Sequence, residues 1–326
     1  MKTKIVYVLV SDTSDYYYEQ TLLSATSARM WNPDAEIIVV ADDKTNATLV
    51  GTRTALMDVA NKKVVVDFPE EINKKRRSRF LKTSIRKHIV GDFLFIDSDT
   101  VICQSLEEVD SLTIEMGAVL DGHRKLQNRQ DALNQKKEKI EMIGASFVEN
   151  AAYYNSGVLY VKDTPQTHAF FEKWYAIYTD GLRKGMDFDQ PSLHLCNQKF
   201  DLIKPLDGEY NCQIFLGGLP YLGYAKIIHA FNGYRDYSNF FIFNDPHYLG
   251  TIKSQGELYD ADLNRLKNAK KQFQGEYVLA FGSQIEYNKS VLFHLFVDNR
   301  RFFHWVEFIG KVLLKIHRSF RRRNVA

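Results

Sequence analysis

The 326-residue sequence has few cysteines, little net charge and no long hydrophobic run. Its three cysteines, Cys103, Cys196 and Cys212, are an odd number without Cys-x-x-Cys spacing, which argues against a disulfide scaffold or a zinc knuckle and fits a reducing compartment. No stretch of about 18 apolar residues occurs, and the run Ile5 to Val10 is too short for a signal-peptide core or a membrane span. We therefore expect a cytoplasmic protein, either soluble or peripheral on the inner face of the membrane.

The composition is otherwise close to that of an average globular protein. Charged residues make up 25% and hydrophobic residues 45%, which excludes a wholly disordered, collagen-like or coiled-coil chain. The formal net charge is only +3 and no nucleic-acid-binding motif accompanies the basic clusters, so a nucleic acid partner is not expected. At about 150 residues per domain, the length is typical of two domains or of one large α/β domain with an appendage.

Strand-like apolar runs alternate with helical stretches over about two thirds of the chain. One expected helix stops at Asn32–Pro33 and another covers Thr167–Tyr178. Farther along, Asp260–Gln274 is expected to form one polar helix. The expected strands are Ile5–Val10, Glu36–Val40, Val64–Phe68, Asp92–Ile96, Ala118–Leu120, Val158–Val161 and Ile227–Ile228. This alternation predicts an α/β fold with a mostly parallel sheet.

Ligands of such sheets bind beyond the carboxyl ends of the strands. Here these ends carry five aspartates and a histidine, namely Asp12, Asp42, Asp97, Asp99, Asp121 and His229. Acidic groups at one edge of a sheet repel one another, so a divalent cation or a hydrogen-bonding ligand would stabilise them. Capping of the following helix is the alternative role of Asp12 and Asp42.

Two carboxylates, Asp97 and Asp99, flank Ser98 directly after a fully apolar strand. Both can reach one hard cation, and oxygen ligands suit Mg²⁺ or Mn²⁺, which keep open positions for phosphate oxygens. His229, at the end of another apolar run, could supply a neutral imidazole as the third ligand. An Asp-x-Asp sequence also arises by chance and a histidine at a strand end is often structural, so both interpretations stay open.

Eight lysines and arginines lie between Lys74 and Lys87, just before the Asp-x-Asp strand. Arg79, Lys82 and Arg86 have the spacing of one helical face. A cationic face beside a metal site suits a diphosphate. A solvated helix is the alternative for most of the eight.

Two further segments place polar side chains at the ends of expected elements. Asn155-Ser156-Gly157 opens an apolar strand, and its glycine allows a ligand or a backbone to approach closely. Asp189 and Gln190 stand at the predicted N-terminus of a helix, where polar side chains can face a substrate. An ordinary turn and simple helix capping are the respective alternatives.

Taken in order, these segments resemble the pattern of glycosyltransferase family 8 over about residues 4–235. The resemblance implies a GT-A fold, which is a Rossmann-like fold for nucleotide-diphospho-sugars. It also implies retaining transfer of a hexose, galactose or glucose, from a UDP-sugar to a glycan acceptor, with Mn²⁺ or Mg²⁺ as cofactor, in the synthesis of cell-surface polysaccharide or lipooligosaccharide. We expect a catalytic domain at residues 1–240 and a mostly helical C-terminal extension at residues 241–326.

The resemblance further implies roles for individual residues. Asp97, Asp99 and His229 would bind the metal. Asp189, Gln190 and Asn155 would surround the reacting carbon of the donor sugar, and since Gln190 is a poor nucleophile, same-face attack within an ion pair is expected. The other contacts to the donor would be Asp12 and one of Tyr16, Tyr17 or Tyr18 at the uridine, Arg79 or Lys82, Ser98, Asp121 at the sugar hydroxyls, and Arg235 at the diphosphate.

The last segment, residues 299–326, contains eight basic residues against one acidic residue, Glu307. Its apolar residues fall at positions 305, 308, 309, 312, 313, 316 and 320, which predicts an amphipathic helix with a basic face. Such a helix suits an anionic membrane surface, and membrane contact would suit a lipid-linked glycan acceptor. Packing of this helix on the core is the alternative.

Three other functions fit parts of the sequence. One is a catalytically inactive domain that binds a sugar nucleotide or a membrane. Another is a haloacid dehalogenase-type phosphatase, whose nucleophile motif matches the segment Asp97 to Val101, although no later acidic pair completes its Mg²⁺ site. The third is a nucleotidyltransferase, which would need a glycine-rich basic loop that Ser11 to Asp15 lack.

Overall fold

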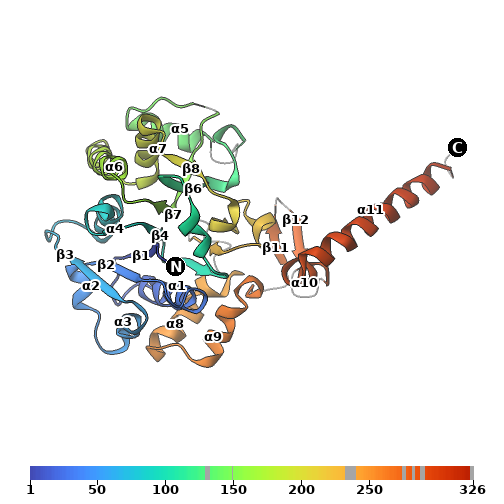
Figure 1. The fold of residues 1–326 in the computed structure, drawn as a ribbon, viewed down its shortest axis with the longest axis horizontal. Helices are drawn as coiled ribbons and strands as arrows, with labels where there is room; N and C mark the ends of the chain where they lie inside the picture. Colours follow the sequence, from blue (N-terminus) through green and yellow to red (C-terminus); the bar gives the residue numbers. More distant parts are fainter. Residues whose placement is uncertain are drawn as a thin grey trace.

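A seven-stranded sheet in the order β3-β2-β1-β4-β7-β6-β8 forms the centre of the computed structural model (Figure 1), which describes residues 1–128, 133–148, 150–231, 240–273, 277–280, 283–286 and 291–323. Its strands are β1 Lys4–Leu9, β2 Ile37–Asp42, β3 Lys62–Val66, β4 Phe93–Ile96, β6 Met116–Leu120, β7 Tyr154–Val161 and β8 Ile203–Pro205. Strands β1 to β4 pair in parallel, as do β6 and β8, whereas β7 runs antiparallel to β4 and β6. The predicted mostly parallel sheet is therefore confirmed.

Helices pack on both faces of this sheet (Figure 1). The helices in the described part of the chain are α1 Tyr17–Trp31, α2 Asp43–Ala47, α3 Ala55–Val59, α4 Lys74–Ser84, α5 Leu133–Met142, α6 Pro165–Arg183, α7 Asp189–Phe200, α8 Pro246–Gln255, α9 Asp260–Lys267, α10 Val291–Asp298 and α11 Arg300–Arg323. The start of α6 follows from its sequence, because Thr164 caps it in a reciprocal capping box and Pro165 occupies the first turn.

Successive residues of a central strand pack into different apolar layers. Val6 of β1 packs in the cluster that contains Leu81 of α4 and Trp174 of α6. Its neighbours Ile5 and Tyr7 belong to the cluster formed with α1 and α3 on the other face. Because both faces are covered, the buried positions of the strand on both faces must be apolar, which explains the uninterrupted apolar runs in the sequence.

A small second sheet pairs a strand that follows β4 with two strands from later in the chain. It contains β5 Thr100–Ile102, β10 Ile227–His229 and β9 Cys212–Gln213. Strand β10 runs antiparallel to β5, and this register sets His229 opposite Thr100. The sheet therefore brings the end of β10 next to the turn that follows β4.

Residues 241–273 pack against the first helix. Phe241, Phe243 and Leu249 share one apolar cluster with Leu23 of α1. The predicted single helix Asp260–Gln274 is wrong, because α9 ends at Lys267 and Asn268 leaves the helical conformation with φ −108° and ψ 27°. The division of the chain at residue 240 stays a prediction.

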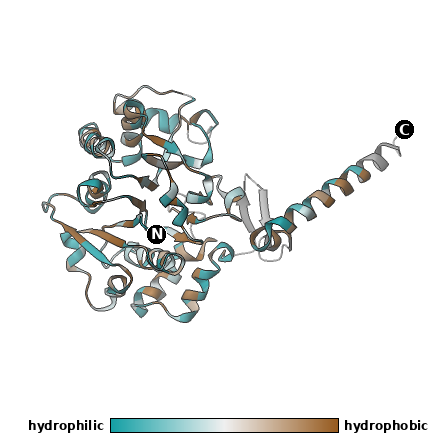
Figure 2. Cartoon of the chain, in the orientation of Figure 1, coloured by the Kyte–Doolittle hydropathy of each residue, from teal (hydrophilic) through white to brown (hydrophobic). Residues whose placement is uncertain are grey.

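The C-terminal region is helical, as predicted. Helix α10 leads into α11, which projects away from the rest of the molecule (Figure 1) and carries apolar and polar residues along its length (Figure 2). Strands β11 Tyr277–Ala280 and β12 Ser283–Glu286 precede it and pair antiparallel with each other. Among the described residues, none of the helices combines the length and the apolar character that crossing a membrane requires.

Candidate functional site

A cavity of about 590 Å³ opens beyond the carboxyl ends of β1 and β4. Strand ends, α4 and the N-terminus of α7 form its walls, as expected for a ligand site of an α/β sheet. The sequence-predicted residues in its lining are Tyr17, Arg79, Lys82, Asp97, Ser98, Asp99, Asp121, Asn155, Asp189, Gln190 and His229. Asp12 and Tyr16 do not line it, and Arg235 falls outside the residues that the structure describes.

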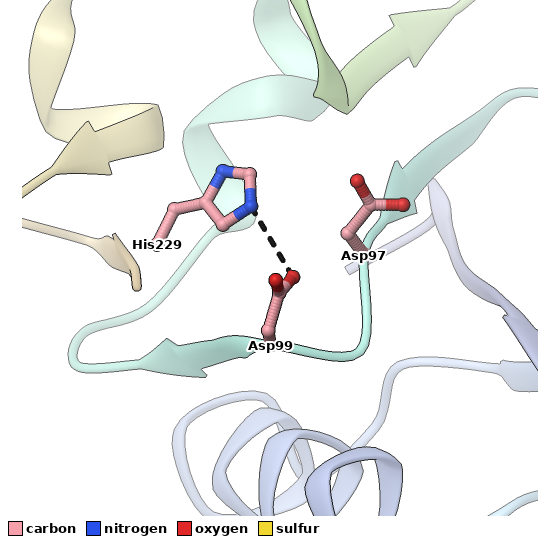
Figure 3. Close-up of side chains that lie close together, drawn as sticks. All are labelled: Asp97, Asp99 and His229. Atoms are coloured by element: carbon pink, nitrogen blue, oxygen red, sulfur yellow. Dashed lines mark ion pairs between the residues drawn. The ribbon is translucent and has the colours of Figure 1, made fainter. Parts of the chain in front are cut away.

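Asp97, Asp99 and His229 converge on one side of this cavity (Figure 3). The chain turns after β4, so that both carboxylates face the end of β10. One ligand atom from each residue lies within 4.8 Å of the other two, and His229 Nε2 lies 3.2 Å from Asp99 Oδ1. The three side chains could therefore bind a single metal ion.

A chain of amide side chains determines the tautomer of His229. The ionised carboxylate of Asp121 only accepts, so Asn155 turns its Nδ2 toward it at 3.2 Å. The Asn155 oxygen then accepts from the Gly157 N–H and, at 3.0 Å, from Asn211 Nδ2. Asn211 therefore presents its oxygen to His229 Nδ1, 2.9 Å away, and that nitrogen must carry the proton.

In its neutral form, the form that binds a metal, the ring consequently has its lone pair on Nε2. This atom is buried and has no hydrogen-bond partner among the described residues, while it faces the acceptor oxygen of Asp99. Two electron pairs that face each other repel, and a cation bound by both removes the repulsion. The pair of carboxylates and one imidazole suits Mn²⁺ and also Mg²⁺.

Two cations of α4 occupy the wall beside this cluster. Lys82 is 3% exposed, and its Nζ lies 3.1 Å from Asp97 Oδ2 and 3.4 Å from Asp189 Oδ2. Arg79 Nε lies 3.0 Å from the other oxygen of Asp189. The cavity thus places two positive charges next to the carboxylates, an arrangement that also suits phosphate oxygens.

Asp189 is a buried and firmly held carboxylate. Burial raises its pKa, but the charges of Lys82 and Arg79 and a 2.7 Å hydrogen bond from Ser156 outweigh this effect and hold the pKa well below its ordinary value. The simple-capping alternative for Asp189 is wrong, because Phe188 is the N-cap of α7 and Asp189 is its first residue. The next side chain, Gln190, has a buried Nε2 without a hydrogen-bond partner among the described residues.

The opposite wall contains Asp121 after β6 and Asn155 in β7. Both are buried, with 6% and 7% of their surface exposed. Lys136 of α5 forms an ion pair with Asp121 and lies 4.3 Å from the centre of the Tyr153 ring. Asp121 and Asn155 therefore line the same cavity as Gln190, so that it contains both hydrogen-bond acceptors and donors.

The loop from Ser11 to Asp15 lies at the edge of the cavity, because it connects Val10 with Tyr17, which both line the cavity. Lys74 forms ion pairs with Asp12 at 2.5 Å and with Asp15 at 2.7 Å. The hydrogen bonds from Lys74 and Ser14 hold the pKa of Asp12 well below its usual range. Asp12 thus stabilises a turn by accepting a hydrogen bond from the Ser14 N–H. The alternative role of helix capping applies to Asp42, which caps α2.

The structure separates the three tyrosines considered for ring stacking. Tyr17 is 47% exposed and lines the cavity. Tyr18 is buried beneath the Arg53 guanidinium, which lies 4.6 Å from its ring centre. Tyr16 packs in the apolar layer around residues 241–273. Of the three, Tyr17 has the position that stacking on a ligand requires.

One expectation about α4 is wrong. Arg86 does not share a face with Arg79 and Lys82, because α4 ends at Ser84 and Arg86 lies in the 3-10 turn that follows. Its guanidinium is buried, donates to the Gly91 carbonyl and forms an ion pair with Asp163 at 3.3 Å. Arg86 therefore holds a turn near Phe93 at the amino end of β4, whereas Asp97 and Asp99 follow the carboxyl end of that strand.

Two residues of the site were missed by the sequence analysis as functional groups. Asn211 orients His229, and Ser156 bridges Lys82 and Asp189. Ser156 stands inside the Asn-Ser-Gly segment, so the motif itself could have indicated it. Asn211 stands in the 3-10 helix Gly208–Asn211, where no motif marks it.

Comparison with known proteins gives one family and several structural neighbours. The family model of glycosyl transferase family 8 matches residues 9–235, more than two thirds of the chain. No curated protein matches the sequence significantly. Mouse xyloside xylosyltransferase 1, in its apo form, is 13% identical over 70% of this chain and 97% of its own, with a TM-score of 0.46.

Two further solved structures are similar to this chain at the same level. The galactosyltransferase LgtC, in complex with donor and acceptor sugar analogues, is 15% identical over 81% of this chain and all (100%) of its own, with a TM-score of 0.49. The glycosyltransferase GlyE of Streptococcus pneumoniae TIGR4 is 15% identical over 78% of this chain and 63% of its own, with a TM-score of 0.43.

Proposed function

The chain belongs to glycosyl transferase family 8 and is a glycosyltransferase, and we propose that it moves a hexose, galactose or glucose, from a UDP-sugar to a glycan acceptor with retention of the anomeric configuration. The GT-A fold predicted from the sequence is confirmed. Family membership also removes the phosphatase and nucleotidyltransferase alternatives. We further propose that the product belongs to a cell-surface polysaccharide or lipooligosaccharide.

One observation supports the proposal most: the buried Nε2 of His229 lies 3.2 Å from Asp99 Oδ1 and close to Asp97, in a cavity that also presents Lys82 and Arg79. Asp97, Asp99 and His229 would hold Mn²⁺ or Mg²⁺. When bound, the metal would supply Lewis-acid stabilisation of the charge that develops on the departing diphosphate. Arg235, expected to contact the diphosphate, stays a prediction because it lies outside the described residues.

Lys82 and Arg79 are fixed before any ligand arrives. Both are held by Asp189, and Lys82 is almost completely buried. Because their charges need no reorganisation, they can stabilise negative charge that builds up during bond cleavage. Ser98 lies between the two carboxylates in the cavity lining and would contact the donor there.

Asp189, Gln190 and Asn155 would surround the sugar. Asp189 is a poor nucleophile because two cations and Ser156 stabilise its carboxylate, which supports same-face attack within an ion pair over a covalent intermediate. Gln190 would direct its unpaired Nε2–H toward a sugar oxygen. Asp121 and Asn155 would bind sugar hydroxyls from the opposite wall, and Asp12 and Tyr17 would hold the uridine.

Helix α11 would bring the enzyme to a lipid-linked acceptor. Its apolar side chains are exposed, with Trp305 at 61%, Phe308 at 64% and Leu313 at 60%. The same helix is rich in lysine and arginine, and near an anionic surface each base contributes about 1 kcal/mol of attraction. We therefore propose a protein that binds the inner face of the cytoplasmic membrane peripherally through α11.

UDP release tests the proposed activity without knowledge of the acceptor. UDP-galactose and UDP-glucose are incubated with the full chain, with and without MnCl₂. We expect Mn²⁺-dependent release from one of the two donors, and loss of at least about 100-fold in Asp97→Ala, because the variant lacks a metal ligand. Asp34→Ala is the control, because Asp34 is exposed and lies just before the amino end of β2; this variant should retain the wild-type rate. Binding of UDP without any turnover of a donor, with or without metal, would favour the inactive sugar-nucleotide-binding domain instead.

A further inference from the structure

A lysine from the C-terminal part of the chain donates hydrogen bonds to the loop Ser11 to Asp15 at the edge of the cavity. Lys253 of α8 donates to the main-chain carbonyls of Thr13, at 2.7 Å, and Asp15, at 2.8 Å. Its ammonium also lies 4.9 Å from the centre of the Tyr16 ring. Because these bonds go to carbonyl oxygens, they fix the path of the loop whatever its side chains do.

Two other cations hold the same loop from different directions. Arg53 donates to the Asp12 carbonyl at 2.8 Å and to Ser11 Oγ at 2.9 Å. Lys74 binds the carboxylate of Asp15 at 2.7 Å. Arg53 and Lys74 are supplied by the sheet-forming part of the chain, whereas Lys253 comes from residues 241–273, to which the sequence assigned no function.

The same segment also reaches the histidine side of the site. Asn244 accepts a 3.0 Å hydrogen bond from Gln20 of α1 and donates to the carbonyl of Ala230, the residue after His229. Ala230 in turn donates its N–H to the Asp99 carbonyl at 3.1 Å. Residues 241–273 therefore contact both the loop before α1 and the residue that follows β10.

We propose that residues 241–273 form part of the nucleotide site and that Lys253 is a positioning residue, which holds Ser11 to Asp15 in the conformation that binds the nucleoside. The inference rests on the proposed function, because that function assigns the nucleoside to this loop. Without Lys253, two carbonyls lose their donor and the loop samples other conformations, so binding must order it. The diphosphate end of the ligand contacts other residues and is unaffected.

The test compares UDP with inorganic pyrophosphate, which contains the diphosphate but no nucleoside. Calorimetry with the full chain and MnCl₂ gives the Kd of each probe for wild type, Lys253→Met and Lys253→Arg. Lys267→Met, an exposed lysine on α9, is the matched control. We expect Lys253→Met to raise the Kd of UDP about 10-fold, which corresponds to about 1.4 kcal/mol, and to leave the Kd of pyrophosphate unchanged.

Lys253→Arg should restore most of the UDP affinity, because the guanidinium also offers several donors. Lys267→Met should match wild type. Unchanged UDP affinity in Lys253→Met, or equal losses for UDP and pyrophosphate, would overturn the inference while leaving the proposed function intact. If Lys253→Met does not fold, Lys253→Gln is measured by the same criteria. A wild-type chain that fails to bind UDP at all would overturn the proposed function, and this inference with it.

Discussion

At the scale of single residues, the tautomer of His229 depends on Asn211, a residue that does not line the cavity. Asn211 accepts from Nδ1 and is itself fixed through Asn155 by the carboxylate of Asp121. Such outer partners usually determine how well a histidine binds metal, because they fix both its tautomer and its orientation. The network also couples the proposed sugar-binding residues to the proposed metal ligand.

Substitution of Asn211 tests this network. Asn211→Leu removes the acceptor for Nδ1–H, so the ring is free to adopt the other tautomer, and we expect the affinity for Mn²⁺ to fall about 10- to 100-fold. Titration of Mn²⁺ followed by electron paramagnetic resonance gives the affinity. Asn264→Leu, at an exposed position of α9, serves as the control. Equal Mn²⁺ affinity in Asn211→Leu and wild type would contradict the assigned tautomer.

Gly157 is a position where a side chain has no room. A Cβ atom there would overlap the ring of His229 and lie 2.9 Å from Asp97 Oδ2. We expect Gly157→Ala to slow Mn²⁺-dependent UDP release at least about 100-fold, because the ligands must shift. Gly310→Ala, which meets nothing within 4 Å, should have no effect on that rate. A Gly157→Ala enzyme with the wild-type rate would show that the ligands can move without loss.

The sequence predicted site residues best where charged or metal-binding side chains directly follow an apolar strand. Carboxylates after an apolar strand predicted the convergence of Asp97 and Asp99, and a histidine at another strand end predicted its position beside them. Asn211 could not be predicted, because its value depends on a contact between the turn before β9 and the end of β10. Which of three adjacent tyrosines faces the cavity likewise depends on how α1 packs.

At the scale of elements, α7 carries the proposed sugar-binding residues Asp189 and Gln190 on its first turn and a buried histidine in its middle. His194 is 5% exposed, and burial lowers its pKa to about 4. Between that value and about 6.5, the unfolded chain binds a proton that the native chain excludes. The free energy of unfolding therefore falls as the pH falls through this window, by up to ~3 kcal/mol.

Urea unfolding at about pH 7 and about pH 4.5 measures this contribution. We expect wild type to lose more stability between the two pH values than His194→Gln does, by about 2 kcal/mol, because glutamine cannot be protonated. His247→Gln, at an exposed histidine of α8, should lose as much as wild type. Equal losses in wild type and His194→Gln would show that His194 titrates normally in the native chain.

Long apolar runs allowed most strands of the central sheet to be predicted to within a few residues. Strands β5 and β9 contain only three and two residues, and they exist because each pairs with β10. No local pattern can indicate such strands. The expected helix Asp260–Gln274 was too long for a related reason, since nothing in the composition of this polar stretch marks the end of α9 at Lys267.

At the scale of the whole molecule, the amphipathic helix α11 projects away from the body that contains the cavity (Figure 1). Arg300 anchors its first turn, because the guanidinium lies 3.4 Å from the centre of the Tyr224 ring. Farther along, Trp305, Phe308 and Leu313 are exposed. The helical character of this region was predictable from its apolar spacing, whereas its direction away from the core was not, since periodicity identifies a face and not its partner.

Trp305 offers a direct probe of membrane contact. The full chain is mixed with vesicles that contain anionic phosphatidylserine and with vesicles of neutral phosphatidylcholine. We expect co-sedimentation and a blue shift of tryptophan emission with the anionic vesicles, and a loss of vesicle binding by at least about 10-fold in the double variant Trp305→Ser, Phe308→Ser. Deletion of residues 299–326 should abolish binding. Unchanged binding after that deletion would contradict the role of α11.

The central claim is that Asp97, Asp99 and His229 form a metal site through which this glycosyltransferase binds a UDP-sugar. Calorimetric titration of UDP into the full chain, with and without MnCl₂, tests it most directly when wild type is compared with His229→Gln. We predict at least about 10-fold tighter binding of UDP with Mn²⁺ in wild type and no such gain in His229→Gln. UDP binding that is independent of Mn²⁺, or equally enhanced in the variant, would contradict the claim.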